Sequence, residues 1–354
     1  MTTITDQQRL DRALARRFRE SLTEEDFSRL DEDDDAVFYR KDRLLSHVDA
    51  RALETIEALV AALIPQREPR ILDLMAGWDS HIPARLRGAE VVGLGLNDTE
   101  LARNMVLDDA VIHDLNRDPR LPFEEASLDA VICSLSVDYL VRPLEVFADV
   151  TRVLRPGGLF LVVFSNRMFE TKAVKLWRQA SEEERVILVE EFFRVTEGLE
   201  PARTFVSKGL PRPAADRYAR QVPTSDPVYA VFADREGGAP VRPARRVPEV
   251  VPPAADDATL QRRLEAVAET LQCPYCQRPL SRVEVPEDAV GEWGGEQVYL
   301  CLEDRCPYFI RGWSVNYRSG MRGYSYRFLY DPSRDRVSPA PVPSARVFKD
   351  RIAG

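Results

Sequence analysis

The chain has 354 residues, of which 44% are hydrophobic, and this length suits two or three domains with a substantial core. Its net charge of −9 argues against a molecule that binds nucleic acid over its whole surface, so any basic patch must be local. No run of about 18 uncharged apolar residues is present, and the N-terminal segment lacks the apolar stretch of a secretory signal. We therefore expect a cytoplasmic protein without a transmembrane helix.

Residues 1–30 predict an amphipathic helix, because hydrophobic residues recur there at helical spacing. These residues are Leu10, Leu14, Phe18 and Leu22. The acidic run 31–35 interrupts the pattern and is typical of a solvated loop. A second helix is expected over 47–63, ended by Pro65.

Short apolar runs then alternate with helical patterns. The runs are typical of buried parallel strands and lie at 70–75, 90–96, 110–113, 128–135 and 158–165. Helices are expected between and after them, at 82–87, 98–105, 143–154, 170–179 and 181–193. A last strand at 227–233 is expected to complete the sheet at an edge. This alternation predicts an α/β fold, with a Rossmann-like, doubly wound sheet and helices on both faces.

The composition changes after residue 235. The next segment is rich in proline and glycine and has no helical periodicity, which predicts a linker. A short helix at 258–271 leads into a module with four of the five cysteines, and the stretch after it is expected to be extended. We expect five parts: a helical N-terminal extension (1–40), an α/β domain (41–235), a linker (236–257), a helix with the cysteine module (258–332) and an extended tail (333–354).

The turn after the first expected strand, LMAGWDSHIP, is the first candidate ligand site. Ligands of doubly wound sheets bind at the carboxyl ends of the strands. Asp73 ends this strand, and Gly77 lets the backbone approach a ligand. Asp79 or Ser80 can cap a following helix. One glycine is not a fingerprint, and Asp73 can equally well serve the turn itself.

Four segments around this turn give it a context: ILDLMAGWD, EVVGLGLN, HDLNRDPRLPFEEASLDAVICSLSVDYL and PLEVFADVTRVLRPGGLFLVVFSN. In this order they resemble class I S-adenosylmethionine-dependent methyltransferases of the methyltransferase type 11 kind, over residues 40–235. The elements RVLRPGG and LPF…LD are the most specific. The resemblance implies that S-adenosylmethionine is bound and that its methyl group passes to an unidentified acceptor.

Two places depart from the family pattern. Met75 and Asp79 stand where the family has glycines, and Gly95 stands where it has an acid that holds both ribose hydroxyls. Asn97, two residues on, offers hydrogen bonds without a charge, so we expect the cofactor to be bound differently or more weakly. The resemblance places these residues against the cofactor, with Asp114 on the adenine side: Asp73, Met75, Gly77, Asn97, Asp114, Leu115 and Ser134.

The segments FYRKDRLLSHVD, DLMAGWDSHIP, GLGLNDTEL and FSNRMFETKAVKLW resemble a subgroup of this family. The subgroup implies a methyltransferase of unassigned substrate and supplies no catalytic residue. The candidates near the expected acceptor are His47, His81, Asn166 and Arg167. Either histidine can orient the acceptor, act as a base near neutral pH, or be structural. Arg167 can pair with an anionic acceptor or with a covering helix, and Cys133 is expected to be inert core.

The other four cysteines form a CxxC pair, Cys273 and Cys276, and a CxxxxC pair, Cys301 and Cys306, with 24 residues between the pairs. In a reducing compartment this spacing predicts one tetrahedral zinc ion held by four thiolates. An iron–sulfur site and redox disulfides are the alternatives.

The segments CPYCQRPL and VYLCLEDRCPYFIRGW resemble zinc ribbons of the Ogr/Delta kind, found in phage-type transcription activators. This implies contact with nucleic acid or protein. Arginines and aromatic residues are interleaved from Arg305 to Arg327, a pattern that can grip phosphate and stack on bases. They are Arg305, Arg311, Trp313, Tyr317, Arg318, Arg322, Tyr324, Tyr326 and Arg327. The alternative is a set of ribbon strands whose aromatic side chains form a small core while the arginines point outward.

Together these features predict a methyltransferase that acts on a small molecule, or on a macromolecule presented by the zinc ribbon. The alternative is a non-catalytic regulatory protein that binds S-adenosylmethionine or a nucleotide and has kept the fold while losing the glycines and the ribose acid.

Overall fold

The computed structural model describes residues 6–66, 68–83, 86, 89–238, 256–285, 297–304, 306–318, 324–343, 347–349 and 352. The chain forms two compact units, Met1–Pro248 and Glu249–Gly354. Most of the linker expected at 236–257 lies outside the described residues. None of the helices in the described part of the chain has the length and apolar character that crossing a bilayer requires.

Four helical segments precede the first strand, where two helices were expected. They are α1 (Asp6–Ser21), η1 (Glu24–Phe27), α2 (Asp35–Phe38) and α3 (Ala50–Leu63). Helix α3 begins after Asp49, whose carboxylate accepts hydrogen bonds from the backbone N–H groups of Arg51 and Ala52. Its apolar face, which includes Ile56 and Val60, is buried against the sheet.

The described residues of the first unit contain a seven-stranded sheet of order β3-β2-β1-β4-β5-β7-β6. The first five strands in this order are parallel, and β7 is antiparallel to both of its neighbours. Their bounds are β1 Arg70–Leu74, β2 Glu90–Gly95, β3 Asp109–Ile112, β4 Leu128–Ser134, β5 Leu154–Phe164, β6 Arg203–Ser207 and β7 Val228–Asp234. The strand order reverses between β1 and β4, which is where such sheets bind ligands. The doubly wound, Rossmann-like sheet is confirmed.

The expectation that the strand at 227–233 forms an edge is wrong. This strand, β7, lies between β5 and β6, so β6 is the edge strand. Sequence reasoning missed β6 because its segment, RTFVS, holds only two adjacent apolar residues. It therefore shows neither the alternation nor the apolar run that marks a strand.

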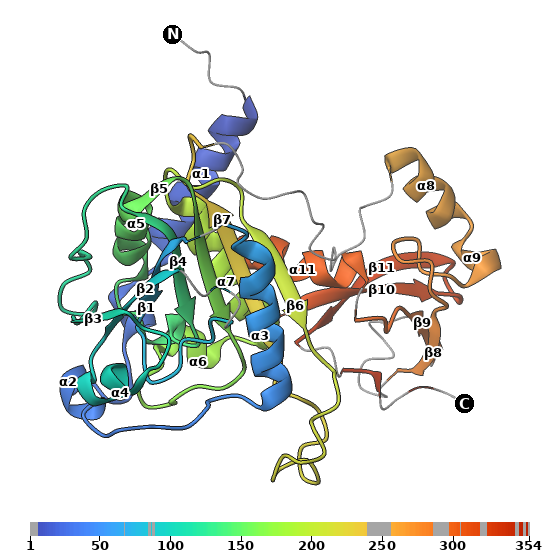
Figure 1. Ribbon diagram of the computed structural model, residues 1–354. Coiled ribbons are helices and arrows are strands. Elements are labelled where there is room, and N and C mark those ends of the chain that lie inside the picture. The colour runs from blue at the N-terminus through green and yellow to red at the C-terminus, as the bar shows by residue number, and fades with distance from the viewer. Residues whose placement is uncertain are drawn as a thin grey trace. The chain divides into compact units, whose positions relative to one another are not determined.

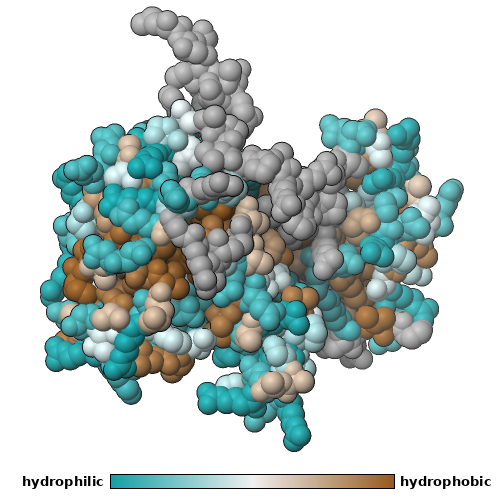
Figure 2. All heavy atoms as spheres, in the orientation of Figure 1, coloured by the Kyte–Doolittle hydropathy of each residue, from teal (hydrophilic) through white to brown (hydrophobic). Residues whose placement is uncertain are grey.

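Helices cover both faces of the sheet (Figure 1). In β5, Leu159 and Leu161 pack in one cluster with α3. Phe160 points to the opposite face, where its ring meets Phe147 of α5 (Pro143–Val153) and Phe193 of α7 (Glu182–Val195). Because successive side chains of a strand point to opposite faces, a continuous apolar strand requires cover on both sides. Figure 2 shows hydrophobic residues gathered over β1–β3 on the face in view, with hydrophilic residues around them.

Two expected helices differ from the structure. At 82–87, Ile82 and Pro83 are not helical, and residues 84, 85 and 87 lie outside the described part. Ile82 precedes a proline, which disfavours the helical conformation. The helix expected at 170–179 is confined to α6 (Lys175–Gln179), because backbone groups of the preceding turn form hydrogen bonds with other segments of the chain. The helix expected at 98–105 is present as α4 (Asp98–Arg103).

The described residues of the second unit contain a four-stranded sheet of order β11-β10-β9-β8, in which neighbouring strands are antiparallel. Its elements are α8 (Asp257–Glu265), α9 (Val267–Thr270), β8 (Ser281–Glu284), β9 (Gln297–Leu300), α11 (Pro307–Arg318), β10 (Ser325–Asp331) and β11 (Arg336–Val342). The helix expected at 258–271 is thus present in two pieces. The proline-rich stretch after residue 332 is extended, as expected, and pairs with β10.

The expectation of ribbon strands after the last cysteine is wrong for residues 307–318, which form α11. Its buried residues Phe309, Gly312 and Asn316 recur at helical spacing, and a Cβ at Gly312 would collide with Ser325. Arg327 does not point outward. Its buried guanidinium donates to the backbone oxygen of Cys301 and to Asp304. Arg305 and Arg322 lie outside the described residues.

The acidic run 31–35 is not solvated throughout, because Asp35 is buried. Arg29 Nη1 lies 2.7 Å from Asp35 Oδ1, and Lys172 Nζ lies 3.2 Å from the same oxygen. Lys172 has no exposed surface and also donates to the backbone oxygens of Asp31 and Asp33. Burial alone would raise the pKa of Asp35, but hydrogen bonds from Asn116 and Arg29 outweigh it and lower that pKa. The loop is therefore fastened by a buried ionic network.

We predict that Lys172→Met lowers the free energy of unfolding by about 3 kcal/mol, because it leaves buried acidic and carbonyl oxygens without their cation. Urea titration of the purified protein measures this. Lys175→Met is the control, since Lys175 pairs with the exposed Glu25 and should contribute less than about 1 kcal/mol. Equal effects of the two changes would contradict the ionic network.

Candidate functional site

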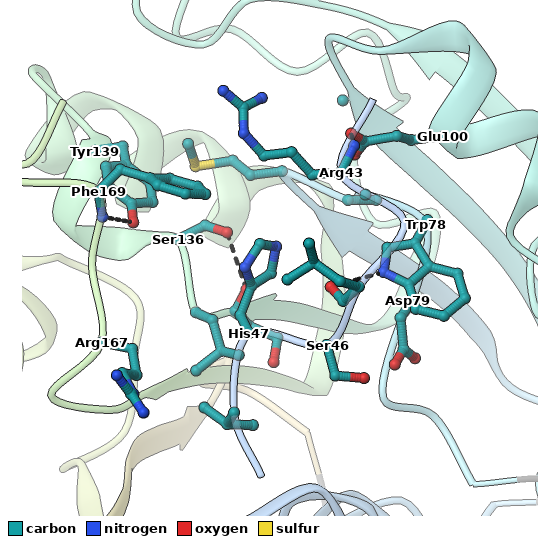
Figure 3. Close-up of a pocket in the computed structure, with 18 of the residues that line it drawn as sticks. Arg43, Ser46, His47, Trp78, Asp79, Glu100, Ser136, Tyr139, Arg167 and Phe169 are labelled. Atoms are coloured by element: carbon teal, nitrogen blue, oxygen red, sulfur yellow. Dashed lines mark hydrogen bonds between the residues drawn. The ribbon is translucent and has the colours of Figure 1, made fainter. Parts of the chain in front are cut away.

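A cavity of about 660 Å³ lies at the carboxyl ends of β1, β2, β3 and β4 (Figure 3). The turns that follow these strands form its floor. Residues from the segments 35–49, 167–169 and 212–226 complete its wall. This is the position at which doubly wound sheets bind ligands, and the volume suits a nucleotide-sized molecule.

The turn after β1 is held against the end of β2. The backbone N–H of Ala76 donates to the oxygen of Leu94 at 2.8 Å. Met75 has a φ of 61°, so it adopts the left-handed conformation that glycine adopts without strain. The position where the family has glycine thus keeps a glycine-like backbone. Asn104 supports the turn by donating to the oxygen of Gly77 and to Ser80.

Neither Asp79 nor Ser80 caps a helix in the described residues. Asp79 accepts a hydrogen bond from the backbone N–H of His81, and Ser80 is buried beneath the turn. The turn therefore leads into irregular backbone at Ile82 and Pro83.

Asp73 is buried and does not line the cavity. Its Oδ2 has no hydrogen-bond partner among the residues that the structure describes. Burial raises the pKa of Asp73 to about 7, and a hydrogen bond from Ser80 offsets only part of this rise. Direct contact between Asp73 and a ligand would require the turn above it to open.

The structure gives Asn97 a supporting place at the cavity wall. Its Oδ1 accepts from the backbone N–H of Glu100 and caps α4. Both hydrogens of its amide are used, in bonds to the oxygen of Tyr39 and to Asp42. Asn97 therefore joins α4 to the 38–42 segment and has no amide hydrogen left for a ribose.

The remaining expected cofactor contacts line the cavity. These are Met75, Gly77, Asp114, Leu115 and Ser134. Asp114 accepts a hydrogen bond from the backbone N–H of Asn116 at 2.9 Å, within its own turn. Ser134 Oγ is buried and has no partner in the described part of the chain.

Three of the four catalytic candidates, His47, His81 and Arg167, line the cavity. Asn166 does not; it is exposed and lies 3.4 Å from Glu182. Arg167 Nε lies 3.1 Å from Asp226 Oδ1, so its partner comes from the loop before β7 and not from a covering helix.

The two histidines differ in their contacts. His81 is buried, and both of its ring nitrogens lack partners within the described residues. Its Nε2 lies 3.9 Å from Asp79 Oδ2. The ring of His47 packs edge-on against Phe169, with 5.5 Å between centroids. Burial lowers the pKa of both histidines, and repulsion from His81 lowers that of His47 further. Both imidazoles are therefore neutral near pH 7.

Sequence reasoning placed His47 and Arg167 near the acceptor, but it missed the other residues that close the cavity. The Arg43 guanidinium lies over the rings of Phe38 and Phe169, at 4.4 and 5.1 Å from their centroids. In the other segment, the buried Arg212 pairs with Asp226 at 2.7 Å and with Asp49 at 3.5 Å. Arg43 and Glu100 belong to the subgroup segments FYRKDRLLSHVD and GLGLNDTEL. These segments were the sequence feature that could have pointed to the two residues.

The second unit holds a cluster of all four expected metal-binding cysteines. Their sulfur atoms lie within 4.8 Å of one another, with 3.8 Å between those of Cys273 and Cys306 and 3.6 Å between those of Cys276 and Cys301. A tetrahedron of zinc–sulfur bonds of about 2.3 Å has edges of about 3.8 Å, so this donor set fits zinc. The sulfur atoms are too far apart for disulfides.

Residues 73–162 match the model of a family described as methyltransferase domain. This matched segment is about a quarter of the chain. It includes the end of β1, all of β2, β3 and β4, and most of β5, and the turns after the first four strands line the cavity. The four cysteines lie outside the matched residues.

Curated relatives agree over part of the chain. It is 32% identical to a demethylmenaquinone methyltransferase of Clavibacter sepedonicus over 126 residues, which are 34% of this chain and 50% of the relative. It is 44% identical over 46 residues to a malonyl-[acyl-carrier protein] O-methyltransferase of Marinomonas sp., or 13% of this chain and 16% of that protein. The chain thus spans half or less of the length of these relatives.

Among solved structures, the chain is similar to an S-adenosylmethionine-dependent methyltransferase of Thermotoga maritima, described as a possible histamine N-methyltransferase. The two are 14% identical, with a TM-score of 0.38, over 52% of this chain and 89% of that one.

The raised pKa of Asp73 predicts a pH dependence of stability. The folded state holds this proton up to about pH 7, whereas the unfolded carboxyl loses it near 3.8. Its contribution to stability is therefore present at low pH and is lost as the pH rises from 3.8 through about 7. Relative to wild type, Asp73→Asn should become more stable over this window, with a slope of at most about 1.4 kcal/mol per pH unit.

Denaturant titrations between pH 4 and pH 8 measure this difference. The exposed Asp33, changed to Asn, is the control, and its difference from wild type should stay nearly constant. A constant difference for Asp73→Asn as well would show that Asp73 is ionised across the whole range.

Proposed function

We propose that the first unit is an S-adenosylmethionine-dependent methyltransferase that binds its cofactor in the cavity at the carboxyl ends of β1–β4. One observation carries this proposal: the segment that matches the methyltransferase family also supplies the turns that form the cavity floor. The acceptor is unidentified.

The polar groups around the cavity fit this cofactor. Ser134 Oγ lies at the end of β4, in the lining of the cavity, and is buried without a partner in the described structure. Buried polar atoms without partners are rare in folded proteins, and the ammonium group of a bound amino acid moiety supplies donors. Met75 and Gly77 would approach the cofactor through their backbone, and Asp114 and Leu115 would meet the adenine.

When bound, S-adenosylmethionine supplies a methyl group on a sulfonium ion. The residues of this chain then have to orient the acceptor and, for an oxygen or nitrogen nucleophile, remove its proton. His81 suits the second task, because its imidazole is neutral and its ring nitrogens have no protein partner in the described residues. Asp79 lies close enough to stabilise the imidazolium that forms. His47 and Arg167 would orient the acceptor.

Calorimetric titration with S-adenosylmethionine and S-adenosylhomocysteine, followed by transfer of labelled methyl groups into cell extract, tests this proposal. Gly77→Val should weaken both ligands at least about 10-fold, since a branched side chain fills the space where the backbone approaches the ligand. Ala58→Val, on the exposed side of α3, is the control and should bind as wild type does. Binding without transfer would favour the non-catalytic alternative, and binding of neither ligand would refute the proposal.

We propose further that the four cysteines of the second unit hold one structural zinc ion, and that this unit contacts a protein or nucleic-acid partner. The convergence of four mostly buried sulfur atoms supports the first part. The apolar core of the sheet is small, so metal binding would contribute much of its folding free energy.

Elemental analysis of the purified protein should find about one zinc per chain. Cys276→Ser and Cys301→Ser should each lose the metal and expose the second unit to protease, whereas the first unit should remain folded. Cys133→Ser should keep the full zinc content, because Cys133 is buried in β4 and is not part of the cluster. Iron in the protein, or two disulfides found by mass spectrometry, would contradict the zinc assignment.

A further inference from the structure

Neither position 95 nor position 97, at the end of β2, can offer a ribose a hydrogen bond from an acid or an amide N–H. A Cβ at Gly95 would collide with the carbonyl oxygen of Ala76, so no acid fits at this position. Asn97 uses both hydrogens of its amide in bonds to the 38–42 segment. The ribose of a bound nucleoside would therefore meet no acid from β2 itself.

Glu100 brings a carboxylate to the same end of the cavity from α4. It is the third residue of the helix, and its backbone N–H is capped by Asn97. Its Oε1 accepts a hydrogen bond from the backbone N–H of Arg43 at 2.6 Å. Its Oε2 lies 3.2 Å from the place that a Cβ on Gly77 would occupy. This second oxygen thus faces the turn after β1, and no hydrogen bond to it is seen among the described residues (Figure 3).

Every other carboxylate that lines the cavity interacts with a charged group, a histidine or the backbone of its own turn. Asp35, Asp49, Asp216 and Asp226 pair with arginine or lysine. Asp79 faces His81, and Asp114 accepts from the backbone of its own turn. Unlike Asp35, Asp49, Asp216 and Asp226, Glu100 can therefore accept from a ligand beside the Gly77 turn without breaking an ion pair.

We propose that Glu100 replaces the missing strand-end acid and accepts hydrogen bonds from the ribose hydroxyls of the cofactor through Oε2, while Oε1 stays on the Arg43 N–H. This assignment rests on the proposed function, because it requires an S-adenosyl compound in this cavity. It also gives the ribose a link to the segment that contains His47, since Glu100 holds the backbone of that segment at Arg43.

The test compares two ligands, S-adenosylhomocysteine and its 2′,3′-dideoxy analogue, by calorimetric titration. Wild type should prefer the ribose compound, because a carboxylate forms charge-assisted hydrogen bonds to the hydroxyls. Glu100→Gln should lose about 10-fold or more in affinity for S-adenosylhomocysteine and bind the dideoxy analogue as wild type does. The amide oxygen of Gln can still accept from Arg43, so the loop keeps its attachment. Glu57→Gln, on the exposed face of α3, is the matched control.

Each outcome separates the two proposals. Equal losses for both ligands in Glu100→Gln would mean that Glu100 only supports the loop, and would overturn the ribose assignment. Wild type that binds both ligands equally would overturn that assignment alone. Wild type that binds no S-adenosylhomocysteine would overturn the proposed function and the assignment with it. If Glu100→Gln fails to fold, Glu100→Asp should still show a loss restricted to the ribose compound.

Discussion

The cavity depends on one backbone contact, between the turn after β1 and the end of β2. Ala76 donates its N–H to Leu94, and its carbonyl oxygen lies where a side chain at residue 95 would have to be. This contact forces glycine at position 95 and brings Gly77 against the first turn of α4. The departures from the family pattern at 75 and 95 are thus parts of one arrangement. Backbone of the turn after β1 occupies the space of a side chain at the end of β2. The carboxylate beside this turn, that of Glu100, comes from α4.

Buried charges hold the segments that close the cavity. Lys172 and Arg29 fix the 31–35 loop through Asp35, and Arg212 ties Asp49 to Asp226. Removing a single member of such a network leaves a charge without compensation, which costs much more than the loss of an exposed pair. These segments have few apolar residues to bury, so ionic contacts define their position. The acceptor would enter between elements that are fixed in this way.

The second unit has a different source of stability. Its sheet buries a small apolar cluster, and Arg327 crosses beneath the cysteine loop to bond the oxygen of Cys301 and Asp304. A buried arginine in a small core is costly unless its donors are satisfied. The four sulfur atoms converge beside it, so the cysteine cluster and this arginine together hold the ends of β9 and β10.

The sequence by itself determined the alternating architecture, because long apolar runs and amphipathic helices are local patterns that carry their own periodicity. It also located the turn after β1 and the cysteine set, and six of the seven residues that it placed against a cofactor line the cavity, since each belongs to a short local motif. It did not reveal β6, the helix at 307–318 or the burial of Asp35 and Arg327, which depend on partners far away in the chain.

Only the tertiary structure decided which polar side chains are available to a ligand. Asn97 and Asn166 have the right chemistry in sequence, yet one is consumed by capping and loop contacts and the other lies outside the cavity. No sequence pattern other than its subgroup segment distinguishes Glu100, yet its carboxylate reaches the Gly77 turn. The physical reason is that each polar side chain can form only a limited number of hydrogen bonds. Which of them are used by neighbouring segments depends on how those segments pack together.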